Sequence, residues 1–227
     1  MAARVGVVLF PGSNCELDAM EAVRDLGGDA EVLWHGDPSL GGVDAVIVPG
    51  GFAHGDYLRP GAIARFSPVM DAVRAFAADG GPVVGICNGF QVLTEAGLLP
   101  GALQKNAGLK FLCTTTTLRV ETTTTPLTSE AAVGDELRIP INHFEGNYTC
   151  DADTLAMLRS EDRVVVRYVE NPNGSVDDIA GVCNEGRNVV GLMPHPERAC
   201  HELVGSTDGI VLLRSLLATA ATGAAAR

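Results

Sequence analysis

Short apolar runs alternate with turn residues along the first half of the chain, a pattern typical of a buried parallel sheet with helical connections. The runs that predict strands are Val5–Phe10, Ala30–Trp34, Val43–Val48 and Pro82–Ile86. Apolar residues at helical spacing predict a helix between the first two strands, with Ser13 or Asn14 as its N-cap. Two more helices are expected, one beginning at Ser67-Pro68 and one directly after Cys87.

The second half of the chain has a different pattern. Thr-rich alternation over residues 112–141 predicts antiparallel strands that lie outside the parallel core. Further strands are predicted at Val164–Val169, Ile179–Asn184 and Val189–Met193. The expected helices run from a cap at Asp151 or Asp153 to about Arg159, and from a cap at Asp208 to about Ala220. Residues 219–227 carry no apolar stripe and are expected to fray.

These elements together predict an α/β fold. The expected architecture is flavodoxin-like, a mostly parallel sheet flanked by helices, with an added antiparallel β segment. Neither an internal repeat nor a linker-like composition interrupts the sequence, so residues 1–227 are interpreted as a single domain.

Charge narrows the possible partners. The net charge of −12 argues against nucleic acid and against an anionic membrane surface, because both require a basic face. The apolar run after Arg4 is too short for a signal peptide or a membrane span, so a cytoplasmic location is expected.

Among the six cysteines there is no C-x-x-C pair, which gives no indication of a zinc site or a dithiol centre. Five of them are expected to be inert packing residues.

The remaining cysteine, Cys87, lies in the segment GICNGFQ (residues 85–91) at the end of a predicted buried strand. Gly85 and Gly89 flank it at −2 and +2, which is the nucleophile-elbow pattern with Cys in place of Ser. The backbone amide of Asn88 would then point at a developing oxyanion. The alternative interpretation is a structural cysteine beside glycines that end a helix.

Two further segments follow predicted strands. In MPHPERA (193–199), Pro196 favours an extended His195, so that His195 and Glu197 can stand side by side as a base and the group that orients it. For His195 alone, the alternative is an ordinary loop histidine. Pro49-Gly50-Gly51 could supply a second oxyanion donor from Gly51 or its neighbour, or could be a plain turn.

The order PGG, GxCxGxQ and HPE resembles the class I (triad) glutamine amidotransferases. Longer stretches are similar to the glutamine amidotransferase subunits of phosphoribosylformylglycinamidine synthases, a family of de novo purine synthesis. These stretches are VLFPGSNCELD, PGGFAHGDYLRPGAIARF, GICNGFQVLTEAGLLPGAL, NGSVDDIAGVCNE and GLMPHPERA. The similarity extends over nearly the whole chain.

The resemblance implies a Cys-His-Glu triad of Cys87, His195 and Glu197. It also implies oxyanion donors at Gly51 and Asn88, and a role for Gln91 in holding the glutamine substrate. The ammonia would pass to a separate synthetase subunit, assembled with a small accessory subunit. That synthetase subunit would use ATP and Mg, whereas this chain would bind no cofactor and no metal.

Departures from the family pattern leave some roles open. Residues 142–146 read NHFEG, where relatives more often have Gly after the His, so the roles of His143 and Glu145 are unassigned. Pro60 replaces a residue that is often Cys. The Gly-rich loop 50–61 is either a solvated loop or, as the resemblance favours, a partner-facing loop that gates the site.

Two other classes of protein remain as alternatives. One is a cysteine peptidase, or a hydrolase or deglycase of the DJ-1/PfpI kind, on a similar elbow fold; it would not require Pro-Gly-Gly or His-Pro-Glu. The other is a nonenzymatic flavodoxin-like binding module. Its phosphate-binding loop would need more Ser, Thr and Gly than PGSN provides.

Overall fold

A computed structural model describes residues 2–226. The strands are β1 Arg4–Leu9, β2 Asp29–Trp34, β3 Ala45–Val48, β4 Val83–Ile86, β5 Ala102–Gln104, β6 Leu112–Val120, β7 Glu136–His143, β8 Asn147–Thr149, β9 Val164–Tyr168, β10 Ile179–Cys183 and β11 Val189–Leu192. The α-helices are α1 Glu16–Asp25, α2 Pro68–Ala78, α3 Asn88–Glu95, α4 Ala152–Ser160 and α5 Gly209–Ala226.

Nine of these strands form one sheet in the order β2-β1-β3-β4-β11-β10-β9-β6-β7. The pairings from β2 to β11 are parallel, whereas those from β11 to β7 are antiparallel. Strands β5 and β8 pair separately as a small antiparallel sheet. The α/β fold with a parallel sheet, flanking helices and an antiparallel segment is therefore confirmed.

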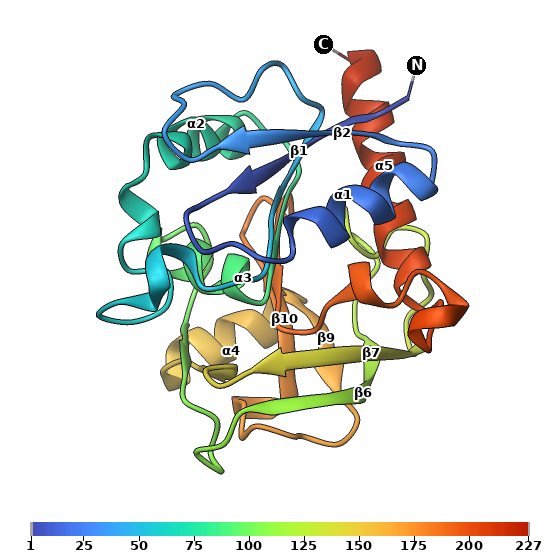
Figure 1. The fold of residues 1–227 in the computed structure, drawn as a ribbon. Helices are drawn as coiled ribbons and strands as arrows, with labels where there is room; N and C mark the ends of the chain where they lie inside the picture. The colour runs from blue at the N-terminus through green and yellow to red at the C-terminus, as the bar shows by residue number, and fades with distance from the viewer. Residues whose placement is uncertain (1, 227) are drawn as a thin grey trace.

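Helices cover both faces of the parallel half (Figure 1). Helices α1 and α5 pack on each other, and α5 contacts β1 and β3, while α3 packs on β3, β4 and β11. All residues of β3, β4 and β11 are buried. Burial on both faces explains why these strands are continuous apolar runs of Val, Ile and Leu rather than alternating sequences.

The antiparallel strands were predicted outside the parallel core, but they continue the same sheet. Strand β6 pairs with β9 on one edge and with β7 on the other. The first Thr tract, Thr114–Thr117, lies within β6, whereas residues 121–135 between β6 and β7 contain turns instead of a strand. The edge of a twisted sheet can accept further strands, and sequence alternation does not indicate which edge is extended.

Two predictions about helix ends are wrong. The N-cap of α1 is Cys15, because the Ser13 hydroxyl instead accepts a hydrogen bond from Phe10 N–H at 3.1 Å. Helix α5 continues to Ala226, well beyond Ala220, although its last turns carry no apolar stripe; Arg227 lies outside the described residues. The cap at Asp151 is confirmed, since its carboxylate accepts from Thr154 N–H at 2.7 Å.

Within residues 2–226, no helix combines the length and the apolar character that a membrane span requires.

Close packing of α3 on β11 predicts the effect of a single methyl group. In Gly191→Ala the new Cβ would lie 2.1 Å from Phe90 Cδ2 and 2.6 Å from Leu99 Cδ1, both in the core. Overpacking of this kind costs about 1–3 kcal/mol. We therefore expect urea unfolding to show a lower free energy of unfolding for this variant.

Gly108→Ala is the matched control, because its Cβ would meet no atom within 4 Å. We expect its free energy of unfolding to stay within about 0.5 kcal/mol of the parent. Equal midpoints for Gly191→Ala and the parent protein would contradict the packing described.

Candidate active site

Four neighbouring parallel strands deliver the predicted site residues to one edge of the sheet. Strands β1, β3, β4 and β11 are adjacent, and their carboxyl ends lead into Cys15, Gly50-Gly51, Cys87 and His195. In an open α/β sheet this edge is where ligands bind. The segments are far apart in the sequence, and they meet here because the strands are parallel.

Cys87 occupies a strained turn between β4 and α3. Its backbone torsions are φ 52° and ψ −107°, a region that residues with a side chain rarely adopt. Backbone strain of this kind costs about 1–3 kcal/mol and is retained where the surroundings fix it. Here Cys87 N–H donates to Leu192 O at 2.8 Å, and Cys87 O accepts from Gln91 N–H at 3.2 Å.

The two flanking glycines are required by close backbone contacts. A Cβ at Gly89 would lie 1.8 Å from Val48 O, and one at Gly85 would lie 2.8 Å from the backbone C and O atoms of Gly89. The strand, the turn and the helix therefore lie so close together that there is no room for a side chain at either position. The nucleophile-elbow geometry predicted from GICNGFQ is present.

His195 and Glu197 form a buried pair beside the elbow. His195 Nδ1 lies 2.6 Å from Glu197 Oε1, and both side chains are fully buried. The backbone of His195, with φ −105° and ψ 86°, lies outside the extended region that was predicted, and Glu197 lies in a one-turn 3₁₀ helix over Pro196–Arg198. The turn, and not an extended segment, places the two side chains next to each other. The histidine backbone is fixed by donation from His195 N–H to Pro140 O at 2.8 Å.

The pair controls the protonation of the imidazole. Burial alone would lower the pKa of His195, but the charges of Glu197 and then Cys87 outweigh it and raise this pKa well above its ordinary value. Within the described residues, Nε2 of His195 has no hydrogen-bond partner. With Nδ1 directed at Glu197, Nε2 is the nitrogen left to exchange a proton with Cys87 or a substrate.

A small cavity of about 50 Å³ brings most of the predicted residues together. Its lining residues are Asn14, Cys15, Gly51, Phe52, Asp56, Cys87, Gln91, Asn142, His143, Phe144, Glu145 and His195. Gly51 lies here with φ +145°, and a Cβ on it would be 2.7 Å from Ser13 Cα. Asn88 begins α3 immediately behind Cys87, so its backbone amide lies at the helix N-terminus.

Gln91 is held by two hydrogen bonds. Its Nε2 donates to Glu145 O at 2.5 Å, and its Oε1 accepts from Asn88 Nδ2 at 2.8 Å. Asn88 also donates to Asp56 Oδ1 at 3.0 Å and accepts from Ala53 N–H at 3.0 Å. This network connects α3 to loop 52–56 and to the 142–146 segment.

Burial shifts the pKa values of two side chains that line this cavity. Burial raises the pKa of Asp56 to about 6, against the hydrogen bond from Asn88 that lowers it. Burial also lowers the pKa of His143 to about 4, and His195 adds to this effect, so His143 is neutral at pH 7. His143 Nδ1 lies 3.1 Å from Asn106 Oδ1.

The structure adds two residues that the sequence did not single out. Cys15, expected to be an inert packing residue, lines the small cavity next to His195. Its position after the first parallel strand was the available signal, since that loop reaches the same sheet edge. Asn142 contributes a backbone oxygen 3.7 Å from the Cys87 Sγ, and no sequence pattern indicates a backbone contact of this kind.

A second, larger groove of about 760 Å³ reaches the same pair from another direction. It is lined by His195, Glu197 and Asn142, together with the acidic residues Asp18, Glu21 and Asp25 of α1. Cys87 lines the small cavity and is absent from the lining of this groove, as far as the described residues go. His195 and Asn142 line both the small cavity and the groove.

Comparison with known proteins agrees with this geometry. A profile of the CobB/CobQ-like glutamine amidotransferase domain matches residues 2–208. The phosphoribosylformylglycinamidine synthase subunit PurQ of Rubrobacter xylanophilus is 63% identical over 217 residues, covering 96% of this chain and 99% of the relative. PurQ of Koribacter versatilis is 54% identical over 224 residues, covering 94% of this chain and 97% of the relative.

A solved structure shows the same similarity. A chain in the structure of PurLQS from Thermotoga maritima matches this fold with a TM-score of 0.89 at 44% sequence identity. The match covers 96% of this chain and 99% of that chain.

The electrostatic role of Glu197 can be tested on the thiol itself. In Glu197→Gln the main influence that raises the pKa of His195 is removed, and burial then lowers it. At pH 6 the imidazole should therefore become neutral and no longer place a positive charge beside the Cys87 sulfur. We expect alkylation of Cys87 by iodoacetamide, followed by mass spectrometry, to slow about 10-fold or more, because a cysteine beside a neutral imidazole is less reactive than one beside an imidazolium.

Glu145→Gln is the control, because Glu145 lines the same cavity and its backbone, not its carboxylate, holds Gln91. Its alkylation rate should stay within about threefold of the parent rate. Equal alkylation rates in Glu197→Gln and Glu145→Gln would show that the His195–Glu197 pair does not control the reactivity of the Cys87 thiol.

Proposed function

Because this chain belongs to the CobB/CobQ-like glutamine amidotransferase family, we propose that it is the glutaminase subunit of a phosphoribosylformylglycinamidine synthase. The observation that carries this proposal is the Cys87–His195–Glu197 arrangement in a chain 63% identical to PurQ over nearly its full length. The function belongs to residues 1–227 as one glutamine amidotransferase domain.

In the proposed reaction, the Cys87 sulfur attacks the side-chain amide carbon of glutamine, with His195 accepting the thiol proton. The tetrahedral intermediate collapses when His195 returns that proton to the departing nitrogen, which leaves as ammonia. Water, deprotonated by the same imidazole, then cleaves the glutamyl thioester to give glutamate and the free thiol. Glu197 holds the ring through Nδ1 and balances the imidazolium charge at each step.

Two backbone amides, of Gly51 and Asn88, are proposed to stabilise the oxyanion. Gly51 lines the small cavity, and Asn88 begins α3, where the helix dipole favours negative charge. Removing one such donor typically costs about 10²–10³ in rate. Gln91 is proposed to hold the glutamine substrate, supported by its fixed position beside Cys87 in the same cavity.

The ammonia is proposed to pass to a separate ATP-dependent synthetase subunit, with a small accessory subunit completing the complex. That enzyme would convert formylglycinamide ribonucleotide to the amidine. The solved structure of PurLQS contains the similar Thermotoga chain, which supports assembly of this kind. ATP and Mg would be used by the synthetase subunit, this chain would bind no cofactor of its own, and the complex would work in the cytoplasm.

Cys87→Ser in the assembled complex tests the proposal. With glutamine as the nitrogen source, synthesis should fall by at least about 10³-fold, because the activated nucleophile is lost. With ammonium in place of glutamine, synthesis should be retained, because the synthetase subunit then receives its nitrogen directly. Both rates are measured as amidine formation.

Exposed Cys113→Ser is the matched control and should leave both rates within about twofold of the parent. Survival of glutamine hydrolysis in Cys87→Ser would contradict the mechanism. Failure of the ammonium reaction in a correctly assembled complex would contradict the division of labour between subunits.

A further inference from the structure

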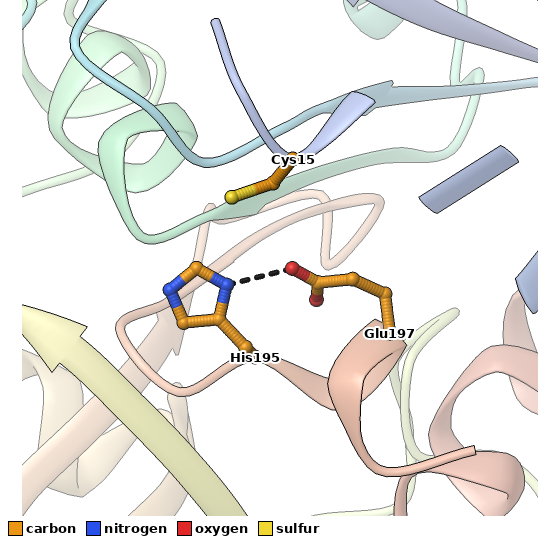
Figure 2. A group of neighbouring side chains, drawn as sticks. All are labelled: Cys15, His195 and Glu197. Atoms are coloured by element: carbon orange, nitrogen blue, oxygen red, sulfur yellow. Dashed lines mark hydrogen bonds and ion pairs between the residues drawn. The ribbon is translucent and has the colours of Figure 1, made fainter. Parts of the chain in front are cut away.

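A third titratable side chain lies against the His195–Glu197 pair. Cys15 is 2% exposed, and its Sγ, a ring nitrogen of His195 and a carboxylate oxygen of Glu197 all lie within 4.8 Å of one another. Figure 2 shows the Cys15 sulfur directed at the imidazole from the side opposite the His195 backbone. The proposed glutaminase reaction does not use this thiol.

Neighbouring groups hold the Cys15 sulfur in place. Arg198 Nη2 donates to it at 3.2 Å, and Arg198 is itself paired with Asp18 at 2.9 Å. A Cβ at Gly50 would lie 2.8 Å from His195 Cε1 and 3.0 Å from the Cys15 Sγ. The sulfur and the ring therefore sit against the same stretch of backbone, and an N–H donor is already aimed at the sulfur, as at many metal-bound thiolates.

The cluster also contains an unused ligand atom. Within residues 2–226, Glu197 Oε2 is buried and has no hydrogen-bond partner. A buried carboxylate oxygen without a partner is uncommon, since buried polar atoms are nearly always satisfied. One of the explanations for such an atom is an ion that binds there.

We propose that Cys15, His195 and Glu197 form a binding site for Zn²⁺ or a similar soft divalent cation. A thiolate, an imidazole and a carboxylate are the ligands that zinc takes in proteins, and three protein ligands leave a fourth position for water. The charge also balances, because the Cys15 thiolate and the Glu197 carboxylate together offset the two positive charges of the ion.

The acidic groove gives an ion a path to the site. His195 and Glu197 line this groove of about 760 Å³, together with the acidic side chains of Asp18, Glu21 and Asp25. Carboxylates along a cleft raise the local concentration of cations. Arg198 also lines the groove, and its ion pair with Asp18 at 2.9 Å offsets its positive charge.

Binding would change the pair in a defined way. The Cys15 thiol proton and the Nδ1 proton of His195 would leave to solvent, so affinity should rise with pH. The 2.6 Å between Nδ1 and Oε1 is too short for an ion with bonds of about 2.0 Å to each, so Glu197 must turn and its hydrogen bond to His195 breaks. If the proposed function holds, zinc therefore inhibits glutamine hydrolysis, and a chelator restores it.

Zinc affinity tests the site independently of activity. We would titrate the full-length Cys87→Ala protein with Zn²⁺ in competition with a chromophoric chelator, and repeat this in Cys15→Ala/Cys87→Ala. Loss of an outer-shell partner costs 10–100-fold in metal affinity, so loss of the Cys15 ligand should weaken binding by at least about 100-fold. Cobalt(II) binding should give a thiolate charge-transfer band in the parent that is missing without Cys15.

Cys200→Ala is the matched control, because Cys200 lines the groove that His195 and Glu197 also line, and its thiol donates a hydrogen bond to Pro196 O. In the Cys87→Ala background, the added Cys200→Ala substitution should leave the zinc affinity within about threefold of that of Cys87→Ala alone. Equal loss in the Cys200 variant, or unchanged affinity and an unchanged cobalt band without Cys15, would overturn the proposal. The proposal would also be overturned if the wild-type protein bound zinc and Cys87→Ala did not, since the ion would then bind Cys87. Cys15→Ser provides a variant of similar size if Cys15→Ala does not fold.

Discussion

The turn at Cys87 is the constraint on which the rest of the site depends. Its positive φ of 52° is tolerated because Gly85 and Gly89 let strand, turn and helix approach more closely than other residues allow. The strain costs about 1–3 kcal/mol, and hydrogen bonds from the neighbouring strand and helix fix it. The thiol is thereby placed at the end of a central strand and at the start of α3, where reaction requires it.

The chemistry depends on a second interaction, the buried hydrogen bond between His195 and Glu197. Removing both groups from water is costly, and the short contact between them offsets part of that cost. The result is an imidazole whose pKa is raised and whose free nitrogen is available for proton transfer. Because Cys15 lies in the same cluster, the features that favour catalysis also bring together the atoms a soft cation would bind.

The antiparallel half of the sheet completes the site instead of merely enlarging the fold. Pro140 O fixes the backbone of His195, Asn142 O contacts the Cys87 thiol, and Glu145 O holds Gln91. All three are backbone oxygens of residues 140–145, which form the end of β7 and the turn after it. Because these contacts are made by backbone oxygens, they do not depend on the side chain at a neighbouring position such as Phe144.

The sequence by itself determined whatever is encoded within a few residues. The elbow glycines around Cys87, the His195-Pro-Glu197 spacing and the apolar strands that deliver them could all be predicted, because each is governed by local sterics or burial. The tertiary structure decided what depends on distant partners. Cys15 meets its neighbour Arg198 across 183 positions of the sequence, and Ser13 caps no helix because Phe10 N–H takes its hydroxyl. The pairing of strands β6 and β7 within the main sheet also depends on distant partners. The shape of the whole core sets which remote segments pair, and no local sequence pattern indicates it.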